Sequence, residues 1–271
     1  MKAILKYPGS KWSLADWIVS FFPKHHSYLE PFFGSGAVLF NKPRSNIETV
    51  NDLDSNVVNL FECIREEPRK LAQMIYLTPY SRKVYESAYA ELPNDKFEAA
   101  LNFYIRLNMG HGFRTNGEKV GWKNDVQGRE RSYASWDWCS LPEKIMQAAE
   151  RLRGVQIENR PALDLISRFN YENVLIYCDP PYLLKTRHGK QYRCEMDDDE
   201  HEMLLRLLLR HKGPVLISGY DTELYQDMLG NWKRYEATSY SQVCCKKKEV
   251  LWMNYKPMGR QMEFADYGGA I

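Results

Sequence analysis

The stretch HSYLEPFFGSGAVLFN, residues 26–41, decides the fold class of this chain. Its first six residues read as a short strand, and its two glycines allow a tight turn into a helix. The run IETVND at 47–52 predicts a second strand, after which Asp54 or Ser55 can cap another helix. Strand, glycine-rich turn, helix, strand and helix in this order are typical of the opening of a parallel α/β sheet.

The same alternation returns in the second half of the chain. The pattern there predicts strands at 155–160, 173–178, 214–218 and 249–255, and helices at 162–169 and 198–210. An apolar stripe with a proline behind it also predicts a helix at 13–22, before the first strand. We therefore expect one sheet that is built from both ends of the chain.

The middle of the chain follows a different pattern. Helical stretches dominate there, at 81–92, 94–109 and 143–153, and the last two are separated by a long segment rich in glycine, charge and aromatic residues. Such a long segment is either functional or disordered, and its aromatic content favours function. We expect an α/β domain from 1–68 and 150–257, a largely helical insert at 69–149 and a frayed tail at 258–271.

The composition limits the class of protein. A net charge of +2 provides no global basic field, so a nucleic-acid partner has to be recognised by local clusters. The six cysteines show no C-x-x-C spacing, which argues against zinc and suits reduced thiols. The chain has neither a signal peptide pattern nor an apolar run long enough for a membrane helix. We expect a soluble cytoplasmic protein without a bound metal.

The glycine-rich turn EPFFGSG at 30–36 is a candidate ligand site. Gly34 and Gly36 let a ligand approach the backbone closely, and the following helix points its amino terminus at that ligand. A turn with two glycines also serves packing, and it lacks the third glycine of the dinucleotide fingerprint. Asp52 ends the next strand, where an acidic residue commonly holds a pair of ribose hydroxyls. Asp54 is the rival acid, although it also makes a good helix cap.

The sequence CDPPY at 178–182 directly follows the most apolar predicted strand. Asp179 and the carbonyl of Pro180 can accept the two N–H groups of an amino group on a planar base, and the ring of Tyr182 can stack on that base. Two acceptors out of the plane would draw the nitrogen towards tetrahedral geometry and free its lone pair. A plain Asp-Pro turn is the alternative, and Cys178 is most simply a small core residue.

The turn YPGSK at 7–11 precedes the first strand and allows two interpretations. Lys11 is either an exposed residue of an ordinary turn or faces a carboxylate in the ligand cleft. The motif by itself does not decide between them.

Taken in order, YPGSK, EPFFGSG, NDLD at 51–54, a variable helical insert and DPPY resemble the Dam-like family of DNA adenine-N6 methyltransferases. The resemblance runs from about residue 5 to residue 255, and only the insert diverges. It implies a Rossmann-like methyltransferase sheet with a helical DNA-recognition insert, S-adenosylmethionine as methyl donor, and flipping of the target adenine out of double-stranded DNA. The implied transfer runs directly from sulfonium to amine and needs neither metal nor covalent intermediate.

Motif position also implies which residues form the site. The resemblance makes Asp179, Pro180, Pro181 and Tyr182 the catalytic tetrapeptide, and it places the cofactor at Tyr7, Lys11, Glu30, Phe33, Gly34, Gly36, Asp52 and Asp179. Asp164 follows the strand at 155–160 and is a further candidate for the adenosine, with capping or a surface role as the alternatives.

The insert departs from the family's usual hairpin, which reads NKxGxFNVPFG. Here the segment is RTNGEKVGWKNDVQGRERSYASWDW, which keeps only the glycine-rich turn, so recognition of the GATC site does not follow. Its basic and aromatic residues are the expected DNA contacts, most of them to phosphates: Arg114, Lys119, Trp122, Lys123, Arg129 and Arg131.

Two further basic runs lie outside the insert. The run at 185–193, with Lys185 and Arg187, is either a solvated loop or a clamp on the distorted DNA strand. The three lysines at 246–248 are expected in a solvated turn between strands.

Other functions remain open from the residues alone. An amino-group methyltransferase that acts on RNA or on protein glutamine also places such a tetrapeptide at this strand end. A catalytically silent DNA-binding relative is a second alternative, although the intact tetrapeptide argues against it. A NAD-dependent oxidoreductase is disfavoured because the turn lacks its third glycine. We expect a monomer or a weak dimer, since flipping one base needs one active site.

Overall fold

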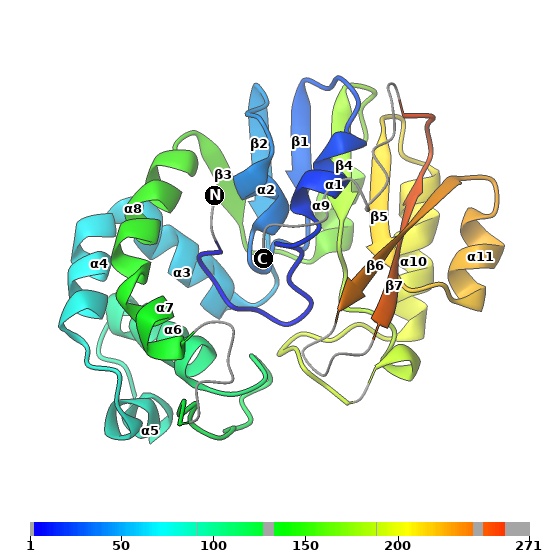
Figure 1. The fold of residues 1–271 in the computed structure, drawn as a ribbon. Helices are drawn as coiled ribbons and strands as arrows, with labels where there is room; N and C mark the ends of the chain where they lie inside the picture. The colour runs from blue at the N-terminus through cyan, green and yellow to red at the C-terminus, as the bar shows by residue number, and fades with distance from the viewer. Residues whose placement is uncertain (1–2, 91, 127–132, 188, 241–245, 258–271) are drawn as a thin grey trace.

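The computed structural model of the protein describes residues 3–90, 92–126, 133–187, 189–240 and 246–257. Within these ranges one seven-stranded sheet lies at the centre, in the strand order β3-β2-β1-β4-β5-β7-β6 (Figure 1). The strands are β1 (Ser27–Glu30), β2 (Ile47–Asn51), β3 (Val155–Glu158), β4 (Val174–Cys178), β5 (Val215–Gly219), β6 (Lys233–Tyr240) and β7 (Lys246–Met253). The first five strands of the sheet order are parallel, and β7 is antiparallel to both of its neighbours. The expected α/β fold class is confirmed.

Helices cover both faces of this sheet, which explains why its central strands read as continuous apolar runs. One face carries α1 (Ala15–Ser20), α2 (Ala37–Asn41) and α3 (Ser55–Glu66), and the other carries α9 (Ala162–Arg168), α10 (Asp198–Leu209) and α11 (Glu223–Leu229). All five residues of β4 are buried. Its side chains alternate between two hydrophobic clusters, with Leu175 and Tyr177 on the first face and Val174, Ile176 and Cys178 on the second.

A helical region lies beside the sheet, on the side of β3 (Figure 1). It consists of α4 (Pro68–Leu77), α5 (Arg82–Ala90), α6 (Lys96–Met109), α7 (Ala134–Cys139) and α8 (Leu141–Arg151). Helix α6 packs on α3 and α4 packs on α8. The buried aromatic residues of this helical region belong to the same hydrophobic cluster as the face of the sheet that carries α1, α2 and α3. The boundaries of the insert therefore stay a prediction.

Two helices of this region were missing from the sequence prediction. Pro68 was expected only to end the preceding helix, but it also occupies the first turn of α4, where its missing N–H costs nothing. Helix α7 lies in the segment that was expected to be a loop, and Trp138 anchors it by donating a hydrogen bond to the carbonyl of Thr78 at 2.9 Å.

A buried ionic cluster ties this helical region to the sheet. Glu48, near the start of β2, accepts bonds from Lys42 Nζ at 2.6 Å and from both terminal nitrogens of Arg151, on α8, at 2.6 and 2.8 Å. Burial alone would raise the pKa of Glu48, but the hydrogen bonds from Arg151 and Lys42 outweigh it and hold the pKa below its usual value. Every partner is satisfied, so the cluster is a structural one.

The end of the chain differs from the expectation. Helix α11 and strand β6 were not predicted, and the expected turn at 246–248 is wrong, because these residues open β7 and pair with 238–240 of β6. Lys248 is exposed and lies 3.1 Å from Glu236 of β6, so a charged position on the hairpin faces solvent while Val250 and Trp252 enter the core. The expected tail at 258–271 lies outside the described residues. No helix in the described ranges is long and apolar enough to cross a membrane.

Candidate active site

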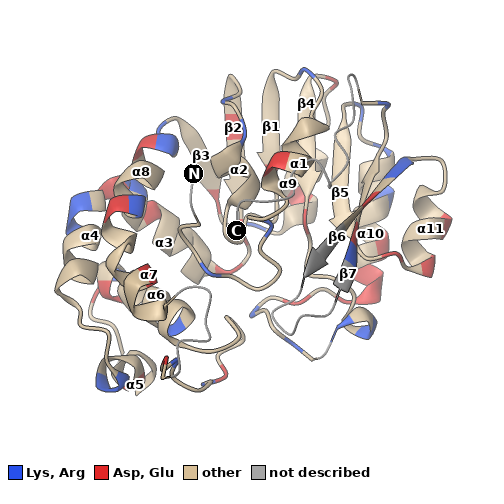
Figure 2. Cartoon of the chain, in the orientation of Figure 1, with Lys and Arg blue, Asp and Glu red and all other residues tan. Residues whose placement is uncertain are grey.

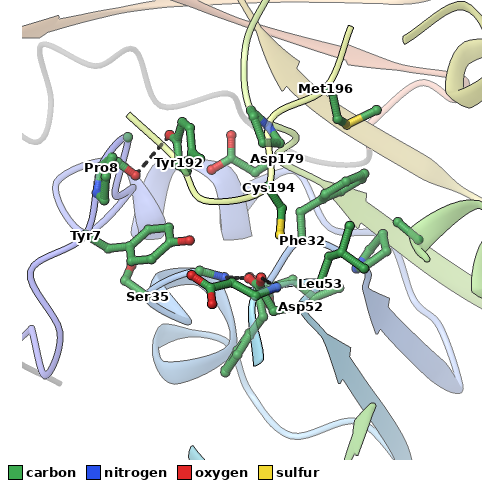
Figure 3. A pocket seen from close by; sticks show the side chains of 18 of the residues that line it. Tyr7, Pro8, Phe32, Ser35, Asp52, Leu53, Asp179, Tyr192, Cys194 and Met196 are labelled. Atoms are coloured by element: carbon green, nitrogen blue, oxygen red, sulfur yellow. Dashed lines mark hydrogen bonds between the residues drawn. The ribbon is translucent and has the colours of Figure 1, made fainter. Parts of the chain in front are cut away.

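The loops that follow β1, β2 and β4 meet at the carboxyl edge of the sheet, where open α/β sheets bind ligands. They surround a pocket with the amino-terminal turn, the start of α9 and the loop before α10 (Figure 3). The predicted site residues that line it are Tyr7, Lys11, Glu30, Phe33, Gly34, Asp52, Asp179 and Pro181. Segments from both ends of the chain therefore form one site.

The glycine-rich turn requires its glycines for conformation and for space. Gly34 has φ +47° and Gly36 has φ +68°, in the left-handed region that side chains disfavour. A Cβ on Gly34 would lie 3.1 Å from the ring of Tyr7, and one on Gly36 would lie 2.6 Å from the ring of Phe33. Gly34 keeps the pocket open, whereas Gly36 permits the tight packing beneath it.

Asp52 fastens this turn to the end of β2. Its carboxylate accepts hydrogen bonds from the backbone N–H of Gly34 at 2.8 Å and of Asp54 at 2.9 Å. Burial, together with the neighbouring charge of Asp54, raises the pKa of Asp52 to about 7, although the two hydrogen bonds lower it. Asp54 caps α3 by accepting from the N–H of Asn56 at 3.0 Å. Both acids line the pocket, and Asp54 is the helix cap.

Asp179 is held by two donors at the wall of the pocket. Lys11 Nζ lies 2.9 Å from its Oδ1, and the hydroxyl of Ser218 donates to the same oxygen at 2.8 Å. Lys11 is only 5 % exposed, so the interpretation as an exposed lysine is wrong and the carboxylate-facing one is confirmed. Burial lowers the pKa of Lys11, but the charges of Asp179 and Glu249 outweigh it and the net shift is upward.

The rest of the tetrapeptide is equally constrained. The hydroxyl of Tyr182 donates to Glu249 Oε2 at 2.5 Å. The carbonyl of Pro181 lies 3.0 Å from Nε2 of His201, whose Nδ1 lies 3.0 Å from the hydroxyl of Tyr225. Burial lowers the pKa of His201, so a neutral ring with its proton on Nε2 satisfies both contacts.

Glu30 is a second carboxyl beside Asp179. It is buried at the end of β1 and accepts a hydrogen bond from the hydroxyl of Tyr28 at 2.7 Å. Burial is the main reason that its pKa rises to about 8, and the charge of Asp179 adds to the shift. At neutral pH this pocket residue is mostly protonated.

A loop after the tetrapeptide, which we call the strap (residues 187 and 189–196), covers the pocket. Arg187 donates from Nε to the carbonyl of Tyr182 at 2.6 Å and from both terminal nitrogens to Glu195. Glu195 also accepts the N–H groups of Gln191 at 2.8 Å and Tyr192 at 3.0 Å. The side chain of Arg187 is 6 % exposed, so it serves as an internal brace in this conformation and does not present its guanidinium to DNA.

The strap supplies pocket residues that sequence reasoning missed. Tyr192, Cys194, Glu195 and Met196 line the pocket, and the hydroxyl of Tyr192 donates to the carbonyl of Pro8 at 3.1 Å (Figure 3). No local pattern marks these residues, because their place depends on contacts with the other end of the chain. Phe32, Leu53 and the segment Pro161–Leu163 were also missed.

The strap touches the insert as well. The N–H of Thr115 donates to the carbonyl of Gln191 at 2.9 Å, and the N–H of Arg193 donates to the hydroxyl of Thr115 at 3.2 Å. The two segments expected to contact DNA therefore lie side by side. Lysine and arginine are spread over many elements together with acidic residues, without a uniformly basic face in the view of Figure 2.

The individual DNA-contact candidates differ in exposure. Arg114 is exposed and pairs with Glu118, Lys119 is exposed, and Lys185 is exposed 3.5 Å from Asp198. Lys123 and Trp122 are half-buried, and the Trp122 ring contacts the ring of Tyr80 and the guanidinium of Arg82. Arg129 and Arg131 lie outside the described residues.

Asp164 is exposed in the first turn of α9 and does not line the pocket. Its neighbours in the chain, Pro161 to Leu163, line the pocket in its place. Any contact of Asp164 with a ligand therefore stays a prediction.

Comparison with known proteins identifies the family. Residues 7–241 match the sequence model of the D12 class N6 adenine-specific DNA methyltransferases. The chain belongs to this family. It is 26% identical over 276 residues to a DNA adenine methylase of Escherichia coli strain K12, with 94% of this chain and 96% of that protein covered. It is also 26% identical over 240 residues to the DNA adenine methylase of Salmonella typhi, with 83% of each chain covered.

A more distant type of relative shares part of its length with this chain. The type II methyltransferase M.FokI of Planomicrobium okeanokoites is 26% identical over 203 residues, which cover 69% of this chain and 30% of that protein. The D12 family confirms the expected adenine-specific DNA methyltransferase activity and the Rossmann-like interpretation of the sheet.

Proposed function

We propose that this D12 methyltransferase binds S-adenosylmethionine in the pocket at the carboxyl edge of the sheet. We further propose that the methyl group goes to N6 of an adenine flipped out of double-stranded DNA. The observation that carries this proposal is the position of Asp179. Its carboxylate borders the pocket and is held on one oxygen, Oδ1, by Lys11 and Ser218. The other oxygen is the proposed acceptor for an amino N–H.

The pocket residues fit such a cofactor. Phe32, Leu163 and Met196 offer apolar wall for a purine, and Asp52 offers carboxylate oxygen to ribose hydroxyls. Gly34 leaves space that a side chain would take from the pocket near Tyr7. Asp179 places a carboxylate at the pocket wall, where it would stabilise a sulfonium cation, and that cation would in turn favour ionisation of Glu30.

Lys11 can serve two partners. An ammonium group has three donors, and in Lys11 one goes to the carbonyl of Gly9 at 2.8 Å and one to Asp179. The third donor is available to the carboxylate of the cofactor. The expected cofactor contact of Lys11 and its pair with the catalytic carboxylate are therefore compatible.

The bound cofactor would supply a methyl group on a positively charged sulfur. Asp179 and the carbonyl of Pro180 would accept the two N–H groups of the adenine, and the ring of Tyr182 would stack on the base. Among the described residues, the Pro180 carbonyl accepts no hydrogen bond, so it is free for this purpose. As the nitrogen gains positive charge, the carboxylate of Asp179 stabilises it at a fixed distance.

DNA would lie against the insert and the strap. Exposed Arg114, Lys119 and Lys185 suit phosphate contacts, which position a duplex without reading its sequence. Site-specific methylation, with Arg129 and Arg131 as further contacts, and a cytoplasmic monomer or weak dimer remain part of this proposal.

The test is methyl transfer from labelled S-adenosylmethionine to unmethylated duplex DNA, followed by nucleoside analysis and mapping of the modified positions. We expect N6-methyladenine within a restricted set of sequence contexts. Parallel reactions contain RNA or a glutamine peptide as acceptor. Label in those acceptors, with none in DNA, would overturn the proposal in favour of a different amine substrate.

A further inference from the structure

The side chain of Tyr182 is fixed on three sides before any base reaches it. Its hydroxyl donates to Glu249 at 2.5 Å. Its ring meets the ring of Tyr220 edge to face, with 4.5 Å between centroids. Lys11 Nζ lies 4.8 Å from the centroid of the same ring. A ring that stacks on a flipped base loses little freedom if it is already held in this way.

Glu249 is distant from Tyr182 in the sequence, and burial of its carboxylate costs free energy of desolvation. It lies on β7 and is 8 % exposed, so its carboxylate has been removed from most of its water. The register pairs Val250 with Gly219, which places Glu249 beside the chain that leaves β5 at Tyr220. The sheet therefore delivers this carboxylate to the end of the catalytic tetrapeptide.

Glu249 also belongs to the charge system of the site. Asp179 and Glu249 both raise the pKa of Lys11, so all three groups are electrostatically coupled. One cation and two carboxylates leave a net negative charge beside the place where the amine nitrogen becomes positive. The pKa of Tyr182 is raised well above its usual value, by burial first and then by Glu249, so its hydroxyl remains a donor.

We propose that Glu249 is a positioning residue for methyl transfer. Through its bond to the hydroxyl, it holds the ring of Tyr182 in the orientation that stacks on the flipped adenine. Its negative charge also lies beside the place where the reacting nitrogen gains positive charge, and stabilises that charge. This proposal rests on the proposed function and adds a residue that lies outside the tetrapeptide and the pocket lining.

The first test replaces Glu249 in the full chain by the neutral Glu249→Gln. We expect the turnover number to fall roughly 10-fold to 100-fold, the effect of a misplaced reacting group, while KM for DNA and cofactor affinity change by less than about twofold. Glu236→Gln is the matched control, since Glu236 lies on the same hairpin and pairs with Arg234 and Lys248 at the surface. It should keep full turnover.

The second test uses Tyr182→Phe, which retains the ring and removes only the hydroxyl. If Glu249 acts through that hydroxyl, Tyr182→Phe also slows turnover, and the double variant is much less impaired than two independent losses would predict. Independent, multiplicative losses would overturn the proposal. Full turnover in Tyr182→Phe would also overturn the proposal. This test still applies if Glu249→Gln does not fold, because Tyr182→Phe leaves Glu249 in place.

The wild-type protein in the same assay separates this proposal from the function itself. If the wild type methylates DNA and Glu249→Gln matches its turnover number, the positioning role alone is wrong. If the wild type transfers no methyl group, the proposed function is wrong and the positioning role fails with it. A stacked fluorescent adenine analogue at the target position gives a direct signal, which should weaken in Glu249→Gln while duplex binding persists.

Discussion

Two buried ionic clusters of this molecule contain the same types of side chain at opposite edges of one sheet. Glu48, Lys42 and Arg151 lie near the amino end of β2, and Asp179 with Lys11 lies beyond the carboxyl end of β4. In the first cluster each charged group has its partners, and the pKa of the carboxyl group is lowered. At the second edge Asp52 and Glu30 have raised pKa values. The carboxylate of the first cluster is paired with cations inside the protein, whereas Asp52 and Glu30 form no ion pair among the described residues and line a pocket that a cationic ligand could enter.

The largest effect should come from the carboxyl edge, on activity alone. Asp179→Asn keeps the shape of the side chain and removes its charge, so methyl transfer should fall roughly 10²-fold to 10³-fold or more. Initial rates with labelled cofactor measure this loss. Asp227→Asn, an exposed site on α11, is the control. A turnover number near that of the wild type would remove Asp179 from the mechanism.

The amino edge should respond in stability. Glu48→Gln leaves Lys42 and Arg151 as buried cations without a carboxylate, which should lower the free energy of unfolding by roughly 3–5 kcal/mol. Chemical denaturation measures this difference. The activity of the folded fraction should not change. A variant of wild-type stability but low activity would contradict the division between the two edges.

The strap should show a smaller effect, on cofactor affinity. Arg187→Lys keeps the charge but loses the two-pronged bond to Glu195 together with the bond to the carbonyl of Tyr182. Bonds to charged groups contribute about 1.5–3 kcal/mol, so cofactor affinity should fall at least about 10-fold. Calorimetric titration measures it, and Arg206→Lys, whose pair with Glu202 is on the surface, is the control. Equal affinities for the two variants would mean that the strap does not close the pocket.

The smallest expected effect is a pH dependence of opposite sign at the two edges. Asp52 and Glu30 have folded pKa values of about 7 and about 8, above their usual 3.8 and 4.5. Their contribution to stability is therefore present below the usual values and is lost as pH rises through about 7 and 8. The pKa of Glu48 is lowered, so its contribution is present above 4.5 and is lost as pH falls through the folded pKa.

The measurement is the free energy of unfolding at about pH 6 and about pH 9, in the wild type and in Glu30→Gln. The wild type should lose more stability than the variant over this range. The positively charged cofactor should reverse part of the loss, because it favours the ionised carboxyl groups. Identical slopes for the two proteins would show that Glu30 ionises normally in the folded state.

The sequence predicted the elements whose signals are local. β4 and the turn at Gly34 and Gly36 follow from apolar runs and glycine spacing, and the structure brings Asp52 and Asp179 to the same pocket. The brace between Arg187 and Glu195 could not be predicted, because it depends on the path of an irregular loop. The lysines at 246–248 look like a turn locally, yet pairing with β6 makes them a strand. The structure of such segments depends on contacts with residues that are distant in the sequence, which local patterns do not show.

The position of β7 in the sheet also bears on the order in which the strands can pair during synthesis. Residue 249 is made long after the tetrapeptide, so a growing chain can fold the parallel strands while β5 still has an open edge. Such an edge can pair with strands of other chains. Arrival of β7 closes it and brings Glu249 to Tyr182 in one step. The protection of the newly made protein from aggregation and the completion of its active site would thus coincide during synthesis.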